Sequence, residues 1–210
     1  MINDTNNNLT WSLGKVKYKD RCEILNQQGL VVWFTGISGS GKSTIAIEVE
    51  SRLIKMGVIA YRLDGDNIRY GLNSDLGFSE EERNENIRRV AEVSALFKDV
   101  GIVTLVSFIS PYKKMREFAK EKIGTNNFME IYIKADLKTC ISRDTKGLYK
   151  KALIGKLNNL TGISSPYEEP DNPNLVIDTS KMNIDEAASK VIDLIFKACL
   201  DRNKMIFKDI

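Results

Sequence analysis

Residues 36–43 combine glycine, lysine and serine in a spacing that binds phosphate. They read GISGSGKS and match G-x-x-x-x-G-K-[ST], with an apolar stretch before them and a helical pattern after them. The glycines allow backbone N–H groups to curl around a phosphate at the N-terminus of a helix. Lys42 would reach the terminal phosphates, and the Ser43 hydroxyl would ligate Mg²⁺. A glycine-rich turn that matches by chance is the alternative, and the flanking patterns disfavour it.

The motif therefore predicts a site for a nucleoside triphosphate with magnesium, in which Lys42 also takes part in catalysis. The chain has no histidine, so carboxylates, lysine, hydroxyls or a bound metal must carry the chemistry. The residues expected to hold the nucleotide are Gly36, Ser38, Gly39, Ser40, Gly41, Lys42, Ser43 and Thr44.

A second reactive stretch, LDGDNIRYGL at 63–72, follows about twenty residues later. It places two carboxylates, Asp64 and Asp66, close to Arg69. Two carboxylates at this spacing suggest metal binding, whereas a plain surface turn needs neither of them. For Asp64, a turn-forming role at the end of a strand is an equal alternative.

The segment 142–159, SRDTKGLYKKALIGKLNN, concentrates positive charge. Its cationic residues are Arg143, Lys146, Lys150, Lys151 and Lys156. As a set beside a phosphate site, they suggest a lid that closes over the triphosphate and excludes water, which would compete with an acceptor hydroxyl. Taken individually, Lys150, Lys151 and Lys156 are better explained as a solvated helix face. The lid favours a small-molecule kinase over a nucleotide switch, and the chain has no N-K-x-D base-reading motif.

Five continuous apolar runs separated by helical patterns must position these residues. Continuous runs are typical of strands that are buried on both faces of a parallel sheet. The order predicts an α/β fold with a doubly wound sheet and right-handed crossovers. The expected strands are 30–35, 58–63, 102–109, 128–133 and 174–179, and the expected helices are 43–55, 79–100, 111–122, 137–143 and 184–201.

The composition of the 210 residues fits one domain, because 42% of them are apolar and no linker interrupts them. We expect a domain over 30–210, preceded by an irregular or partly helical arm over 1–29. A net charge of +3 calls for no nucleic-acid or membrane partner, and no apolar run approaches the roughly 18 residues that span a bilayer. The start lacks a secretory pattern, and three scattered cysteines suggest a reducing cytoplasm.

Further motifs follow in order: LGFSEEERNENIRR, FISPY, KGLYKKA and TGISSPYEEP. With the two stretches above, they make the chain resemble the adenylyl-sulfate kinases from about Trp11 to Ile195. The resemblance implies a P-loop NTPase fold with a five-stranded, mostly parallel sheet, helices on both faces and a basic lid segment. It implies transfer of the γ-phosphate of ATP, with Mg²⁺, to the 3′-hydroxyl of adenosine 5′-phosphosulfate. It also implies a cytoplasmic homodimer, and association with ATP sulfurylase is a further expectation.

Two other functions stay open on the residues alone. One is a P-loop kinase that acts on another small hydroxyl-bearing metabolite. The other is a regulatory domain that binds nucleotide without turnover. Intact Lys42, Asp66 and Arg83 argue against the second, because a site that has lost its activity tends to lose such residues first.

The resemblance assigns Asp66, Asn67 and Arg69 to the acceptor. Asp66 would orient the 3′-hydroxyl, accept its proton and help to hold Mg²⁺ together with Ser43. Arg69 would clamp the phosphosulfate, because a guanidinium bonds two anionic oxygens at once. The resemblance leaves Asp64 a supporting or structural role.

Arg83 and Asn86 match the next acceptor motif and would share one face at the start of a helix. Ser79 is expected to cap this helix, with Glu82 three residues later completing a capping box. Arg88 and Arg89, by contrast, are expected to form solvent or structural pairs.

Ile109 and Ser110 would contact the substrate at the end of the third strand, and Ser110 is also counted as catalytic. A simple helix N-cap is the alternative for Ser110, with Pro111 opening the next helix. In the lid, Lys146 matches the lysine that contacts the acceptor. Arg143 matches an arginine near the adenine or the phosphates of ATP.

Phe78 would stack on the adenine of the acceptor, and a hydrophobic staple before the helix is the alternative. The family usually has a second aromatic residue where this chain has Leu160. Leucine can cover a base face but loses the aromatic stacking, which contributes roughly 0.5–1.5 kcal/mol. We therefore expect the same reaction with weaker acceptor binding.

Overall fold

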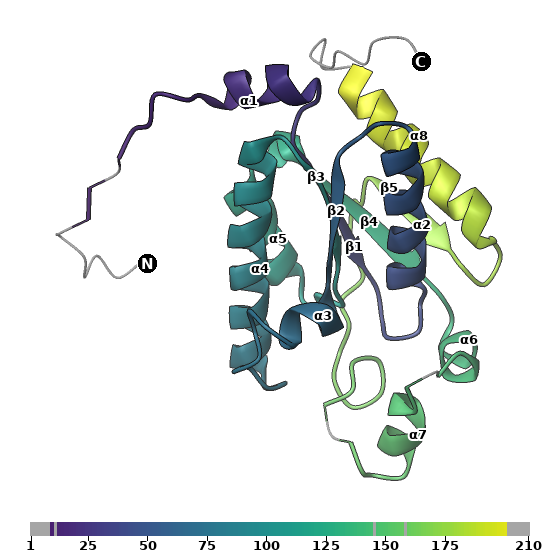
Figure 1. Cartoon of the computed structure of the whole chain (residues 1–210). Helices are drawn as coiled ribbons and strands as arrows, with labels where there is room; N and C mark the ends of the chain where they lie inside the picture. The colour runs from purple at the N-terminus through teal and green to yellow at the C-terminus, as the bar shows by residue number, and fades with distance from the viewer. Residues whose placement is uncertain (1–8, 11, 145, 158, 201–210) are drawn as a thin grey trace.

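Five parallel strands form the centre of the molecule, and helices cover both faces (Figure 1). The structure, a computed structural model, describes residues 9–10, 12–144, 146–157 and 159–200. For residues 199 and 200 it describes the backbone alone. Trp11 and residue 201, where the resemblance and the last helix were expected to begin and end, lie outside these ranges. The strands are β1 Leu30–Thr35, β2 Ala60–Asp64, β3 Val103–Ser107, β4 Phe128–Lys134 and β5 Leu175–Asp178.

The sheet has the order β2-β3-β1-β4-β5 and is wholly parallel, which confirms the predicted α/β fold. From the central strand β1 the chain passes to the edge strand β2, returns to β3 beside β1, and then continues outward on the other side through β4 and β5. In such sheets ligands bind beyond the carboxyl ends of the strands, where the winding reverses. Here that place is the end of β1, between β3 and β4. β3 ends at Ser107 rather than at 109, because the next two residues form a loop that lines the cavity described below.

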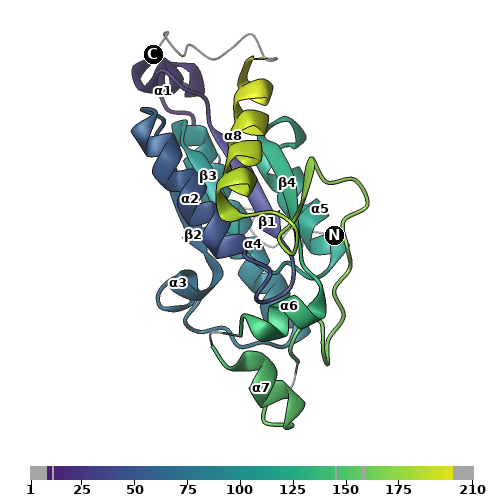
Figure 2. The ribbon, with the colours of Figure 1, turned by 90° about the vertical axis from the view of Figure 1, so that its right-hand side faces the viewer.

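Two pairs of helices sandwich the sheet (Figures 1 and 2). α2 (Lys42–Lys55) and α8 (Ile184–Leu200) pack together on one face, and α4 (Glu80–Val100) and α5 (Lys113–Ile123) pack together on the other. The remaining helices are α1 Tyr18–Leu25, α3 Gly65–Arg69, the 3-10 turn η1 Thr125–Asn127, α6 Leu137–Ser142 and α7 Leu148–Leu153. The expected arm is thus partly helical, and α1 lies at the opposite end of the sheet from α6 and α7 (Figure 1).

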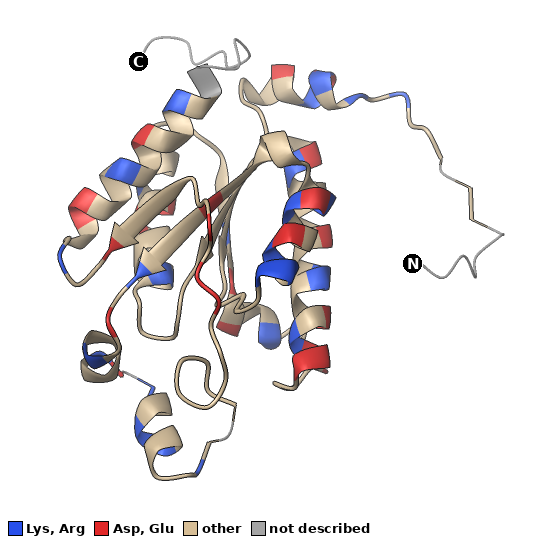
Figure 3. Cartoon of the chain, turned by 180° about the vertical axis from the view of Figure 1, so that it is seen from behind, with Lys and Arg blue, Asp and Glu red and all other residues tan. Residues whose placement is uncertain are grey.

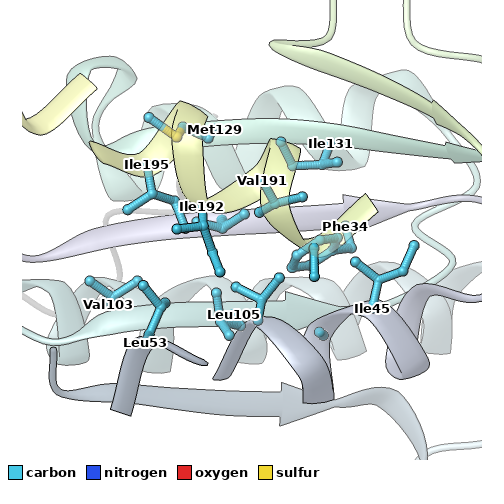
Figure 4. Close-up of a cluster of buried hydrophobic side chains, with 14 of the residues drawn as sticks. Phe34, Ile45, Leu53, Val103, Leu105, Met129, Ile131, Val191, Ile192 and Ile195 are labelled. Carbon is cyan, nitrogen blue, oxygen red and sulfur yellow. The ribbon is translucent and has the colours of Figure 1, made fainter. Parts of the chain in front are cut away.

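β1 is buried along its whole length because both of its faces are covered. Its side chains alternate, as strand geometry requires. Leu30, Val32 and Phe34 join the core under α2 and α8, which Figure 4 shows around Phe34, Ile45 and Val191. Val31 and Trp33 join the core under α4 and α5 instead. The two cores hold β1 rigidly, and with it the loop that follows.

The helix starts test the capping predictions. Ser79 caps α4 as predicted: its Oγ accepts from Glu82 N at 3.2 Å, and its own N–H donates to Glu82 Oε2 at 3.0 Å. The prediction that Pro111 opens the next helix is wrong, because α5 begins at Lys113 with Tyr112 as N-cap. Ser110 is no N-cap either, since it has a left-handed φ of 44° and leaves the helix path.

The outer strand β2 has a free edge that is covered in part by a side chain. Arg62 N donates to Glu50 Oε1 of α2 at 2.9 Å rather than to a neighbouring strand. The Arg62 guanidinium also lies near Glu50 and pairs with Asp64 at 3.2 Å. These contacts fix the end of β2, from which the acceptor stretch continues.

Candidate active site

A cavity of about 1090 Å³ opens beyond the carboxyl ends of the strands. It lies where α3 and the α6–α7 segment surround the end of β1 in Figure 1. Most of the predicted site residues line it: Ser38, Gly39, Gly41, Lys42, Ser43, Thr44, Asp66, Asn67, Arg69, Phe78, Arg83, Asn86, Ile109, Ser110, Arg143, Lys146 and Leu160. Gly36 and Ser40 do not line it. The two sequence stretches and the lid therefore meet around one space.

Gly36 and Ser40 belong to the phosphate loop but lie outside the lining of the cavity. A Cβ on Gly36 would come within 2.3 Å of Ile133 O, and its φ is 146°, so only glycine fits there. Ser40 is fully buried, with its Oγ unpaired in the described part of the chain. Gly41 has a φ of 100° and begins α2, so the loop turns directly into the N-terminus of a helix. This geometry suits an anion.

Lys42 is buried at the floor of the cavity and donates to Ile37 O at 2.8 Å. Burial lowers the pKa of its ammonium to about 8, and Asp64 and Cys140 offset part of that effect. Because burial without a counter-anion is costly, the lysine is poised to gain from an arriving phosphate.

Ser43, Asp64 and Ser107 bring oxygen atoms together beside the loop. Ser43 Oγ donates to Asp64 Oδ2 at 2.6 Å and lies 3.3 Å from Ser107 Oγ. Asp64 is buried, and its Oδ1 also accepts from Asp66 N at 3.1 Å, which caps α3. Asp64 is therefore both the structural residue predicted and a direct neighbour of Ser43, a role that the sequence left undecided.

This oxygen set fits a magnesium ion that is shared with nucleotide phosphates. Mg²⁺ prefers one or two carboxylates plus substrate oxygens over a cage made of protein alone. Among the described residues no cluster of three or more acidic, cysteine or histidine side chains forms such a cage. Ser43 and Asp64 offer oxygen atoms beside the loop, and Asp66 lies two positions after Asp64 in the first turn of α3.

Asp66 lines the cavity and is exposed at the start of α3. Its carboxylate pairs with the ammonium of Lys146 from the lid. Asn67 follows on the same short helix and is exposed to the cavity. The lid lysine and the proposed base, which are 80 positions apart in the sequence, are thus brought into direct contact.

Arg69 and Phe78 form a stacked pair. The guanidinium carbon of Arg69 lies 4.3 Å from the centre of the Phe78 ring, and its NH1 donates to Leu76 O and Gly77 O at 2.8 and 2.9 Å. The ring is 60% exposed, so it forms no hydrophobic staple and keeps a face free for a base. Desolvation first, and the charge of Arg83 second, lower the pKa of Arg69. Two nearby cations that repel each other favour an anion between them.

Arg83 and Asn86 are three positions apart on α4 and both line the cavity, but they make different contacts. Arg83 donates to Phe78 O at 2.9 Å, to Thr161 Oγ1 at 2.7 Å and to Asn159 O, so it joins α4 to the far end of the lid. Asn86 is buried and accepts from Asn73 Nδ2 at 2.8 Å. Arg88 and Arg89 form ion pairs with Glu85, as predicted for structural residues.

Ser110 is held by a buried network behind the cavity. Its Oγ accepts from Trp33 Nε1 at 2.9 Å, and its carbonyl oxygen accepts from Arg116 NH1 at 2.6 Å. The neighbouring Ile109 carbonyl accepts from Thr35 Oγ1 at 2.7 Å. Arg116 is itself paired with Glu130. The left-handed backbone of Ser110 is therefore enforced by its surroundings, which is a common arrangement at ligand sites.

The lid spans α6 and α7, and Lys and Arg residues recur along it (Figure 3). Lys150, Lys151 and Lys156 are exposed, as expected for a solvated face. Arg143 donates to Thr179 Oγ1 and O at 3.0 and 2.8 Å, on the nucleotide side. Leu160 is buried and packs in a small cluster with Cys140 and Tyr149 while also lining the cavity.

Sequence reasoning missed three residues of the site. Ser107 ends β3 beside Ser43, and Thr179 follows β5 beside Arg143. Tyr149, in the quoted KGLYKKA motif, is fully buried and donates to Ser38 O at 2.8 Å. The position of Ser107 and Thr179 just at or after a strand end is the signal that could have found them.

The chain was then compared with known proteins. A model of the adenylylsulphate kinase family matches residues 28–178. The curated adenylyl-sulfate kinase of Geotalea uraniireducens is 51% identical over 201 residues, covering 94% of this chain and 95% of that protein. That of Clostridium acetobutylicum is 48% identical over 193 residues, covering 92% and 96%.

A solved structure agrees with the family match. The Mycobacterium tuberculosis APS kinase CysC in complex with AMPPNP and APS aligns with a TM-score of 0.78 at 46% identity, over 81% of this chain and 99% of that chain. The sequence motifs, the family model and the fold therefore agree, and the chain belongs to the adenylyl-sulfate kinase family of ATP-dependent kinases.

Proposed function

We propose that this chain transfers the γ-phosphate of MgATP to the 3′-hydroxyl of adenosine 5′-phosphosulfate, with the residues of the cavity in the roles given below. The observation that carries the proposal is the meeting of the phosphate loop, the Asp66–Arg69 helix and the basic lid around a single cavity. A kinase needs these three parts together, whereas a nucleotide-binding domain without turnover needs only the first.

The nucleotide half of the cavity holds the donor. Backbone N–H groups of the loop and of the first turn of α2 bind the phosphates, and Lys42 balances their charge from the floor. Arg143 lies near the nucleotide base or phosphates through its bonds to Thr179. These groups favour the charge that spreads over the transferred phosphoryl group.

Ser43 and Asp64, with Asp66 nearby, are the residues that would hold magnesium. A bound Mg²⁺ neutralises phosphate charge and orients the phosphates for in-line transfer. Ser107 would support Ser43 through the contact between their hydroxyl groups.

Asp66 orients the attacking hydroxyl and accepts its proton as the bond to phosphorus forms. The ammonium of Lys146 pairs with this carboxylate and so holds it beside the lid. Lys146 also carries a positive charge to the acceptor side, as the family resemblance implied.

Arg69 and Arg83 recognise the anionic part of the acceptor. They provide adjacent guanidinium groups, each anchored by backbone carbonyl oxygens. Phe78 offers a free ring face to the adenine, and Leu160 covers the other side from the lid. Asn67, Asn86, Ile109 and Ser110 complete the wall of this half. The hydroxyl of Ser110 accepts a hydrogen bond from Trp33. Direct transfer to the acceptor is proposed because the phosphate loop, the metal and Asp66 suffice for it.

The test is ATP consumption with adenosine 5′-phosphosulfate, with adenosine monophosphate, and with no acceptor. We expect turnover with the first and little with the other two. Turnover on another hydroxyl compound alone would favour a different kinase, and turnover without an acceptor would favour a hydrolase. ATP binding without any turnover would favour a regulatory domain.

Assembly and location extend this proposal. We propose a cytoplasmic homodimer, with association with ATP sulfurylase as a further partner to test by co-purification. A solved APS kinase from Thiobacillus denitrificans is hexameric, at 32% identity, so larger assemblies exist among similar proteins. In the described part of the chain, no helix has the length and apolar character to cross a membrane.

A further inference from the structure

Side chains from outside the phosphate loop bond two of its carbonyl groups. Tyr149 OH donates to Ser38 O at 2.8 Å, and Thr179 Oγ1 donates to Ser40 O at 2.8 Å. Tyr149 belongs to α7 in the lid, and Thr179 directly follows β5. Neither residue belongs to the loop motif, and both are more than 100 positions from the loop in the sequence.

A trans peptide is planar, so the C=O of one residue and the N–H of the next point in opposite directions. The described chain has no cis peptide. A bond to Ser38 O therefore fixes the direction of the Gly39 N–H, and a bond to Ser40 O fixes that of the Gly41 N–H. Neither N–H donates to another group in the part of the chain that the structure describes. Both amides stay available to a phosphate.

The two glycines make this anchoring necessary. Gly39 and Gly41 have φ angles of 75° and 100°, in a region that glycine enters freely. A glycine peptide plane that nothing holds can also rotate away. Preorganised N–H groups bind and stabilise an anion better than groups that must first be ordered.

The two hydroxyl groups are well placed to donate. Tyr149 is 1% exposed, and burial raises the pKa of its phenol, so it stays protonated. Thr179 Oγ1 accepts from Arg143 NH1 at 3.0 Å, which leaves its proton free for Ser40 O. Lys134 O, the other acceptor for this hydroxyl among the described residues, lies farther away at 3.4 Å.

We propose that Tyr149 and Thr179 are positioning residues that hold the Ser38–Gly39 and Ser40–Gly41 peptides so that both glycine N–H groups face the phosphates of ATP. The inference rests on the proposed kinase function and adds to it two residues outside the loop motif. It also gives the lid a second task. Lys146 pairs with the carboxylate of Asp66, and Tyr149, three positions later, orders the phosphate loop.

The test compares Tyr149→Phe and Thr179→Val, which each remove one hydroxyl, with Thr179→Ser, which keeps it. Tyr61→Phe is the matched control, because Tyr61 is an exposed residue of β2 whose ring packs edge-on against Phe97. Calorimetry would measure ATP and ADP binding without acceptor, and adenylyl-sulfate binding without nucleotide. Steady-state kinetics would give KM for ATP, and melting temperatures would report on folding.

We expect Tyr149→Phe and Thr179→Val to weaken ATP and ADP binding and raise KM for ATP by roughly 3- to 10-fold, as loss of one hydrogen bond implies. Adenylyl-sulfate binding should stay unchanged, and Thr179→Ser and Tyr61→Phe should resemble the wild type. ATP affinity within twofold of the wild type in both hydroxyl-deleted variants would overturn the inference. So would an equal loss of both substrates together with a lower melting temperature, since that pattern reports general loss of packing. A wild type that binds ATP but does not phosphorylate adenylyl sulfate would count against the proposed function instead.

Discussion

In the predicted nucleotide half of the cavity, six of the lining residues come from one short segment, 38–44, at the N-terminus of α2. In the acceptor half, they are side chains from α3, α4, the end of β3 and the lid. The nucleotide half is held between two buried cores, whereas Asp66, Arg69, Phe78 and Lys146 of the acceptor half are partly or fully exposed. The predicted phosphate site is thus formed by residues that are close together in the sequence. The predicted acceptor site is formed by residues that only the fold brings together.

If the two halves work independently, a change in Asp66 should stop phosphate transfer without weakening ATP binding. Asp66→Asn keeps the size of the side chain and removes its ability to take the proton of the hydroxyl. We expect kcat to fall by about 10²–10⁴-fold, the usual contribution of a general base. ATP affinity measured by calorimetry should stay within a few-fold of the wild type. Near-normal turnover would remove Asp66 from the base role, and a large loss of ATP affinity would break the division into halves.

Arg83→Lys tests the acceptor half at the residue with the widest reach. Lysine cannot hydrogen-bond Phe78 O, Thr161 Oγ1 and Asn159 O at the same time, because it lacks the planar guanidinium of arginine. We expect KM for adenylyl sulfate to rise by about 10- to 100-fold, as loss of charged hydrogen bonds implies. KM for ATP should change little.

The matched control is Arg88→Lys, in the same helix, because Arg88 only pairs with Glu85 at the surface. Such exposed pairs contribute about 0–1 kcal/mol, so both KM values should stay near those of the wild type. Equal effects of the two variants on adenylyl sulfate would contradict the assigned role of Arg83.

The nucleotide half should respond to pH through Lys42, whose pKa is lowered to about 8 chiefly by burial. As pH rises through 8, the free protein loses the charge that ATP needs, so ATP affinity should fall roughly tenfold by pH 9. The unfolded chain keeps its proton up to about 10.5, so it binds more protons than the folded chain between these values. The stability of the free protein should therefore rise from pH 8 to 10.5, opposite to the trend in affinity.

Lys42→Met separates these trends from the titration of other groups. It should bind ATP weakly at every pH, and both pH dependences should disappear. Calorimetry from pH 7 to 9 and thermal melting from pH 7 to 10.5 would measure them. Unchanged slopes in the variant would show that another group is responsible.

Leu160→Phe gives the smallest expected effect and sharpens the acceptor half alone. An aromatic ring opposite Phe78 should strengthen adenylyl-sulfate binding by roughly 0.5–1.5 kcal/mol, through stacking. ATP affinity should not change. Because Leu160 packs in the lid cluster with Cys140 and Tyr149, a melting curve is needed to detect overpacking. A stable variant without any gain in affinity would sink the idea of a stacking deficit.

The same contrast explains how much of the molecule the sequence predicts. β1 was predicted to the residue, because continuous apolar side chains end at a glycine motif. The capping box of Ser79 and Glu82 was equally local and is confirmed. The predicted start of α5 was wrong, because the Ser110 hydroxyl accepts a hydrogen bond from Trp33 and Ser110 takes a left-handed backbone. Neither effect can be read from the local sequence.

The site follows the same rule. The loop residues could be predicted from their spacing, whereas the acceptor residues needed the resemblance to a family. The role of Asp64 could not be decided from the sequence. An aspartate at the end of a strand is typical of a turn, and the same residue can also hydrogen-bond a distant side chain such as Ser43. The packing of Tyr149 under the loop depends on α7, a helix of 6 residues that Asp144 starts by accepting from Leu148 N and Lys150 N. No periodicity reveals so short a helix.

The covered edge of β2 bears on how copies of this chain can associate. Another strand that approached this edge would need the N–H of Arg62, which the Glu50 carboxylate already occupies, and it would meet both charges. Growth of the sheet from one molecule into the next is therefore discouraged on this side, which protects a concentrated solution from edge-to-edge aggregation. Addition of a strand from a second copy at this edge is therefore not expected, and the other edge of the sheet is β5.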